Sequence, residues 1–360
     1  MSGRVFDVQV VHTPPESSRG QLLQQYVLAR VMSMQDINLD LYDYDRHNAL
    51  YFFAVNAEEQ IYFRYGGRDS EAPDTYLNLD SLELALKAGL QQHDLYREGK
   101  RVGTAPPAPR YPRDIPGIQK FVLDRGRCVE CHHLAHFESM ELERSGELDK
   151  LRHMYRSPDI KKLGIHLDIP QGLRIAEAKG AALKAGLATG DVILEIESEP
   201  VITFGDFQYR LDKVDRRATT LSIAVERKGE KKEIEIQLPD LWFVTDLEHR
   251  FWTIEPRLYF EADPLSVDEK KSLGFPDDGF ASRVTEVPFE AMLEQANELE
   301  KGDIIYSVDG VERDDVAKDA ALYVKLTCRS GDTVTLGVLR GDERIELPLN
   351  TKRKSFRRLD

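Results

Sequence analysis

Hydrophobic and polar positions in the first hundred residues follow a pattern that predicts a mixed α/β domain. Residues 5–11 are rich in β-branched side chains, and residues 37–44 alternate apolar with polar positions, so each segment predicts a strand. Residues 49–55 form a short apolar run, and residues 60–65 return after a turn-like segment. Together these last two segments predict a β-hairpin.

Two helices are predicted around these strands. Residues 79–93 place Leu82, Leu86 and Leu90 on one stripe, which is typical of an amphipathic helix. A first helix is expected after a proline-containing turn, which is a tolerated helix start. Its apolar positions are Leu22, Leu23, Tyr26, Val27 and Val31.

The middle of the chain changes character. Residues 98–117 hold five prolines beyond Thr104 and predict a semi-rigid linker. Residues 118–158 are rich in charged side chains, show no strand signal and are expected to be helical. Gly146 is expected to break that helix.

The second half repeats internally. Gly190-Asp191-Val192-Ile193 recurs as Gly302-Asp303-Ile304-Ile305, and Leu163-Gly164-Ile165 recurs as Leu273-Gly274-Phe275. Solenoid repeats are roughly 20–50 residues long, so this much longer period indicates duplicated domains.

Composition narrows the class of protein. The chain has 360 residues, 41% hydrophobic and 31% charged, with a formal net charge of −14. An acidic chain argues against general nucleic-acid binding, which needs a basic face. No apolar run is long enough to predict a membrane span.

The repeated motifs resemble the PDZ domains of bacterial HtrA-type envelope proteases. In that family the Leu-Gly-φ loop (φ, an apolar residue) points backbone N–H groups at a peptide's terminal carboxylate, and the next strand pairs with the peptide. The resemblance implies two PDZ-like, partly open β-barrels that bind peptide or protein C-termini. The implied binding residues are Leu163, Gly164, Ile165, His166 and Leu167 in the first unit, and Leu273, Gly274 and Phe275 in the second.

The second unit departs from the pattern. Pro276-Asp277-Asp278-Gly279 interrupts the segment after its loop, and 289–293 replaces the small-residue helix of the first unit. Its carboxylate pocket is therefore the more doubtful one. Between the units, both tryptophans are expected to fill a seam in an aromatic connector.

The whole order resembles a family of bacterial thioredoxin-like proteins with two C-terminal PDZ repeats and a Cys-x-x-Cys-His segment. The resemblance implies a thioredoxin-like N-terminal domain, but residues 13–18 hold no thiol where that fold carries its dithiol. The expected division is 1–97, thioredoxin-like domain; 98–117, linker; 118–158, helical segment; 159–239 and 272–350, PDZ units; 240–271, connector; and 351–360, basic tail.

No protease catalytic set accompanies the PDZ motifs. The chain has no Gly-x-Ser-x-Gly, and the first domain is too short for the double β-barrel of a trypsin-like protease. We therefore do not expect hydrolase activity.

The sharpest chemical motif is Cys128-Val129-Glu130-Cys131-His132, which matches the c-type haem attachment pattern. Haem c would use both thiols as anchors and His132 as an axial ligand. A zinc site, a redox dithiol and a pair of inert cysteines are the alternatives. Candidate further ligands are Met140, His153 and, less favourably, His136.

Two classes of function follow. The first is a cell-envelope adaptor that binds peptide C-termini, and the second is a redox or electron-transfer protein that the PDZ units dock to a redox partner. Haem attachment occurs outside the cytoplasm, so haem would imply a periplasmic or envelope location. The start of the chain shows no export signal, which leaves a cytoplasmic location open.

Overall fold

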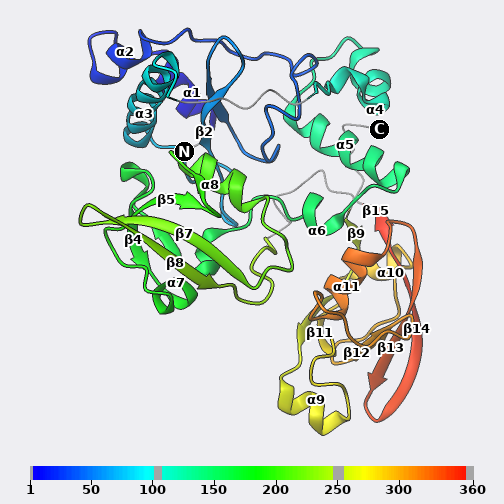
Figure 1. The fold of residues 1–360 in the computed structure, drawn as a ribbon. Helices are drawn as coiled ribbons and strands as arrows, with labels where there is room; N and C mark the ends of the chain where they lie inside the picture. The colour runs from blue at the N-terminus through cyan, green and yellow to red at the C-terminus, as the bar shows by residue number, and fades with distance from the viewer. Residues whose placement is uncertain (1–2, 101–107, 246–254, 354–360) are drawn as a thin grey trace. The chain divides into compact units, whose positions relative to one another are not determined.

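The computed structural model describes residues 3–100, 108–245 and 255–353 (Figure 1). The chain forms two compact units, Met1–Phe251 and Trp252–Asp360. Part of the predicted linker (101–107), the connector's Trp252 and most of the basic tail (354–360) lie outside the described residues.

The N-terminal region of unit 1 contains one hairpin and three helices. The predicted hairpin and the predicted second helix are confirmed, as β1 with β2 and as α3. The elements are α1 (Gly3–Val11), α2 (Ser18–Leu23), β1 (Tyr51–Val55), β2 (Ile61–Gly66) and α3 (Leu79–Arg97).

The strand predicted at residues 5–11 is wrong, because these residues form α1. Phe6 is fully buried and Val10 packs beside it, one helical turn apart, whereas Val5 and Val8 are exposed. Three of the four valines that suggested a strand, Val5, Val8 and Val11, therefore lie on the solvent-facing side of a helix.

Residues 37–44 form turns instead of the second predicted strand. The Asn38 side-chain oxygen accepts hydrogen bonds from the backbone N–H groups of Asp40 and Leu41. Such local bonds compete with a strand ladder. The thioredoxin-like interpretation depended on these two strands and finds no support in the described residues.

The Cys-x-x-Cys-His region is built from short helical pieces that share one apolar cluster. Ile118, Val122 and Leu134 are completely buried there, together with Leu39 from the N-terminal turns. The break at Gly146 is confirmed, because α5 ends there in a left-handed conformation. The helices are η1 (Pro112–Asp114), α4 (Pro116–Ile118), the π-helical η2 (Gln119–Leu123), α5 (Cys131–Ser145) and α6 (Lys150–His153).

The first module follows within the same unit. One sheet has the strand order β6-β5-β7-β8, and β3 pairs separately with β4. The elements are η3 (Ile160–Leu163), β3 (Ile165–Leu167), η4 (Ile169–Gln171), β4 (Ile175–Ala178), α7 (Gly180–Lys184), β5 (Val192–Ile196), β6 (Glu199–Pro200), α8 (Phe204–Leu211), β7 (Thr220–Arg227) and β8 (Glu230–Gln237).

The N-terminal region packs on this module rather than forming a separate domain. Strand β2 contacts α8, which lies between the hairpin and the sheet of the first module (Figure 1). Arg156 joins the two parts, because its guanidinium lies 2.9 Å from Asp43 and 2.8 Å from Asp212. Burial tends to raise the pKa of Asp43, but Arg156 and Lys213 outweigh it and leave the pKa well below its ordinary value.

The second module forms most of the second unit. Its five strands follow the order β10-β11-β12-β13-β14, and β9 pairs with β15. Strand β10 lies inside the expected connector, so the module reaches back before residue 272. The elements are β9 (Pro256–Arg257), β10 (Glu261–Pro264), α9 (Val267–Leu273), β11 (Ser282–Glu286), α10 (Phe289–Leu293), β12 (Ile304–Val308), α11 (Ala320–Thr327), β13 (Thr333–Arg340), β14 (Glu343–Asn350) and β15 (Lys352–Arg353).

The first part of the expected connector, residues 240–245, belongs to unit 1, whereas its residues from 255 onward belong to unit 2. Trp242 and Phe243 are each 2% exposed, and Phe243 packs edge-on against Tyr155 with ring centroids 5.7 Å apart. Cys328 is buried, as expected, but it caps helix α11 and does not lie in a strand.

Candidate functional site: the loop and groove of the first module

The Leu-Gly-φ loop of the first module turns around Gly164. Its φ of +84° lies in the left-handed region that favours glycine. A Cβ at this position would lie 2.0 Å from the Lys179 carbonyl oxygen, so backbone packs directly against backbone. The glycine is therefore required by the fold of the loop itself.

The Gly164 N–H is already bonded within the loop. That N–H donates to the Lys161 carbonyl at 3.0 Å, and the Gly164 carbonyl accepts from Lys179 at 2.7 Å. Because bonding alternates along an antiparallel pair, Ile165 directs its N–H and carbonyl away from β4. The backbone groups offered to a ligand at this loop are therefore those of Ile165.

Of the other predicted residues of the first module, Leu163 ends η3, and Ile165, His166 and Leu167 form β3. Leu163 and Ile165 are completely buried, while His166 and Leu167 on β3 are half-buried. The loop thus has an apolar base, and β3 leads away from it.

Helix α8 runs alongside β3 in the opposite sense. A pocket of about 310 Å³ is lined by Ile169, just after β3, and by Phe204 at the start of the helix. Asp212, at the other end, accepts a hydrogen bond from Ser157, which precedes the loop. These two contacts place the start of α8 near the end of β3 and the end of α8 near the loop, and we take the space between β3 and α8 as the candidate peptide groove.

The second module contains the same ion pair between a buried aspartate and an arginine as the first. Asp191 forms a bidentate ion pair with Arg227, and Asp303 forms the same pair with Arg340. Burial tends to raise the pKa of Asp191, but the Arg227 hydrogen bonds outweigh it and lower the pKa. The two modules can therefore be superposed on this pair.

The strand ladders identify the second module's true loop. In the first module His166 pairs with Glu177 and the register then shifts; in the second, Glu261 pairs with Glu286 and shifts in the same way. His166 thus corresponds to Glu261. Counting back from this pair, the loop equivalent to 163–165 is Leu258-Tyr259-Phe260.

The prediction that placed the second loop at Leu273-Gly274-Phe275 is therefore corrected. Gly274 ends helix α9 and Phe275 is buried behind it, in a connection between β10 and β11. Tyr259, with a φ of +59°, adopts the conformation that Gly164 has in the first module. The sequence holds no glycine at this position to mark a left-handed turn. Only the distance in sequence between this loop and strand β11 would have revealed it.

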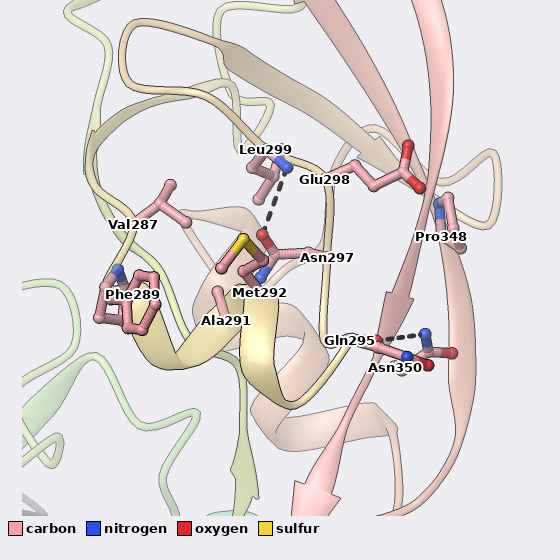
Figure 2. A pocket seen from close by; sticks show the side chains of 11 residues that line it. Val287, Phe289, Ala291, Met292, Gln295, Asn297, Glu298, Leu299, Pro348 and Asn350 are labelled. Carbon is pink, nitrogen blue, oxygen red and sulfur yellow. Dashed lines mark hydrogen bonds between the residues drawn. The ribbon is translucent and has the colours of Figure 1, made fainter.

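A second pocket lies beside the corrected loop. Asn297 lines it, and the Asn297 side-chain amide also donates to the carbonyls of Leu258 and Tyr259 at 3.0 and 3.3 Å. Figure 2 shows residues of α10 and the end of β14 around this pocket. Its apolar lining is Val287, Pro288, Phe289, Ala291, Met292, Leu299 and Pro348.

The two thiols of the cysteine cluster differ in exposure, because Cys128 is exposed and Cys131 is partly buried. The Cys131 sulfur lies 3.1 Å from the Tyr44 hydroxyl and 3.4 Å from the Met34 sulfur. Burial raises the pKa of Tyr44 well above its ordinary value. A covalent haem needs both sulfurs on one open face, so this arrangement does not fit haem unless Cys131 turns outward.

The predicted further ligands do not converge on the cysteines. His153 Nδ1 accepts a hydrogen bond from the Asp149 N–H, and Met140 packs against the apolar cluster around Leu134. His136 packs edge-on against Phe137. Across residues 3–100, 108–245 and 255–353, no three His, Cys, Asp or Glu side chains gather as a possible metal site.

Comparison with known proteins agrees with the loop geometry. Residues 163–238 match the PDZ domain family. The first module is therefore a PDZ domain.

The relatives are HtrA-type proteases. The chain is 29% identical over 194 residues to the periplasmic pH-dependent serine endoprotease DegQ of Escherichia coli K12, covering 53% of this chain and 39% of that protein. The chain thus spans about two fifths of the length of this curated relative.

Solved structures of the HtrA-type protease AlgW are also similar. The complex with a tripeptide is 17% identical and covers 50% of this chain and 59% of that one, with a TM-score of 0.26. The complex with a decapeptide is 18% identical and covers 38% and 42%, with a TM-score of 0.24. TM-scores this low carry no weight for the arrangement of the whole chain. Among the described residues, no helix has the length and apolarity of a membrane span.

Proposed function

We propose that the protein is a cell-envelope adaptor that binds the C-termini of peptides or proteins through its first PDZ domain. The observation that carries the proposal is the loop at residues 163–165. It lies at the end of the candidate groove between β3 and α8, and its bonding pattern turns the N–H of Ile165 away from β4. A terminal carboxylate accepts such an N–H, and the residues before it extend along β3 as an added strand.

The relatives support this class of ligand. The AlgW structures are complexes with a tripeptide and a decapeptide, and DegQ is described as periplasmic. An envelope location for this chain is part of the proposal, and the periplasmic location of DegQ supports it.

The carboxylate mechanism is tested with one peptide in two forms. A fluorescein-labelled decapeptide ending in Ala-Val-Leu is titrated with the full chain, once with a free carboxylate and once as the amide, and anisotropy is recorded. We expect the acid to bind at least tenfold more tightly, because the amide loses the charge-assisted hydrogen bond. Equal affinities would contradict the mechanism.

Haem c or another metal at Cys128, Cys131 and His132 stays a prediction, and with it the redox or electron-transfer alternative. The chemistry that haem would supply is electron transfer, with His132 as the proximal ligand. What this chain itself provides there is one accessible thiol and one thiol packed against Tyr44 and Met34. The intact mass of the purified chain distinguishes attached haem from free thiols.

A further inference from the structure

The face of α8 that borders the groove of the first PDZ domain is covered by the protein's own N-terminal region. The covering segment, residues 66–76, begins at the last residue of β2 and precedes α3. We propose that this segment is an internal occupant of the groove, which a peptide must displace. The proposal rests on the peptide-binding function proposed above and adds a means of regulating it.

The Gln208 side chain, at the middle of α8, holds the segment by bonding to its backbone as a neighbouring strand would. The Gln208 side-chain oxygen accepts the Arg68 N–H at 3.1 Å, and the Gln208 amide donates to the Arg68 carbonyl at 2.7 Å. Gln208 is 2% exposed. Both backbone groups of one residue in the segment are therefore bound by the helix wall of the groove.

The start of α8 is covered by two close contacts. The ring of Tyr76 stacks on Phe204 with centroids 3.4 Å apart, and both rings are buried. Gly67 packs on the same ring so closely that a Cβ there would lie 2.5 Å from it. Phe204 is thus enclosed by the segment from two positions.

The segment continues toward the loop that would take a carboxylate. Ser70 donates from its N–H and its hydroxyl to one carboxylate oxygen of Asp159, at 3.0 and 2.6 Å. Lys161, two residues further along and itself part of η3, forms an ion pair with Asp69 at 2.8 Å. The segment therefore runs from Phe204 past Gln208 to the residues just before Leu163, along the length of the groove.

The segment is held by the Gln208 and Ser70 hydrogen bonds, the Lys161 ion pair and the stack of Tyr76 on Phe204, and a peptide must break these contacts to enter. The affinity of a ligand for a groove that is open only part of the time falls by the open fraction. Loosening the segment should therefore strengthen peptide binding without any change to β3, α8 or the loop.

The test compares two glycine variants of the full chain. Gly67→Ala forces the segment away from Phe204, whereas Gly99→Ala places a side chain at another positive-φ glycine where nothing lies within 4 Å. A milder pair is Ser70→Ala, which removes the hydroxyl bond to Asp159, and Ser18→Ala, which removes an exposed bond to Glu83. The second pair keeps the test valid if the glycine variants do not fold.

Two readouts separate this proposal from the function on which it rests. Affinity is measured with the carboxylate decapeptide, and hydrogen–deuterium exchange is followed in residues 66–76. We expect Gly67→Ala or Ser70→Ala to bind at least fivefold more tightly than its control, and bound peptide to speed exchange in the segment of the wild-type chain. Peptide binding that leaves both the affinities and this exchange unchanged would overturn the internal occupant. Faster exchange in the variants with no peptide binding at all would instead refute the peptide-binding function.

Discussion

Gly164 is the residue on which the loop of the first PDZ domain depends most. Its left-handed φ and its contact with the Lys179 carbonyl are independent constraints, and either one disfavours a side chain. Gly229 has nearly the same φ, +83°, but open space around its missing Cβ. The two glycines therefore separate backbone strain from packing.

We expect Gly164→Ala to lower the free energy of unfolding clearly more than Gly229→Ala does. The control carries only the left-handed penalty of about 1–2 kcal/mol. Gly164→Ala adds a backbone clash that only a shift of the loop or of β4 relieves. Urea denaturation of both variants measures the difference. Equal decreases in the free energy of unfolding would show that the backbone at Lys179 moves aside at little cost.

At this scale the sequence predicted residues well where the chemistry requires a particular type. The Gly-Asp turns were recognised because the motif recurs in both units, and in the structure Asp191 and Asp303 each hold an arginine in a bidentate pair. Tyr259 was missed because the second module tolerates a left-handed tyrosine where the first uses glycine. A tyrosine in the sequence does not indicate a positive φ.

Helix α5 shows how an element depends on its first turn. Glu130 caps the helix, and the Glu130 N–H donates to Nδ1 of His133 at 3.2 Å. His133 is buried, and burial together with the nearby His132 lowers its pKa below the ordinary value of 6.5. A protonated Nδ1 could no longer accept that bond.

The sign of the pH effect follows from this depressed pKa. Above about pH 6.5 His133 is neutral in both the folded and the unfolded chain. As the pH is lowered below this value the unfolded chain takes up the proton first, so the free energy of unfolding decreases. We expect the melting temperature of the wild-type chain to fall between pH 7.5 and 5.5, and His133→Gln to fall less. The same decrease in both proteins would assign it to other groups.

Helices and strands were predicted correctly where the hydrophobic periodicity fitted a single kind of element, and wrongly where it fitted more than one. The hairpin of residues 51–66 and helix α3 have strong, unambiguous periodicity. Residues 5–11 carry valines that suit a strand, but only Phe6 and Val10 face the core. Which face is buried depends on tertiary packing, which the sequence alone does not display.

At the scale of the whole molecule, the N-terminal region and the first PDZ domain form one unit. Arg156 bridges Asp43 and Asp212, and segment 66–76 follows α8. The sequence predicted the repeat but not this association, because contacts such as Gln208 with Arg68 join residues far apart in the chain. The second module keeps the same ladder and bulge, with β10 at the edge of its described sheet.

The central claim is that the groove between β3 and α8 receives a peptide's C-terminus. The most direct measurement uses the same decapeptide with a photoreactive benzophenone side chain at its last residue, cross-linked to the full chain and mapped by mass spectrometry. The account predicts cross-links within residues 163–167 and α8, and their loss when the peptide is amidated. Cross-links confined to other regions, or equally strong with the amide, would contradict it.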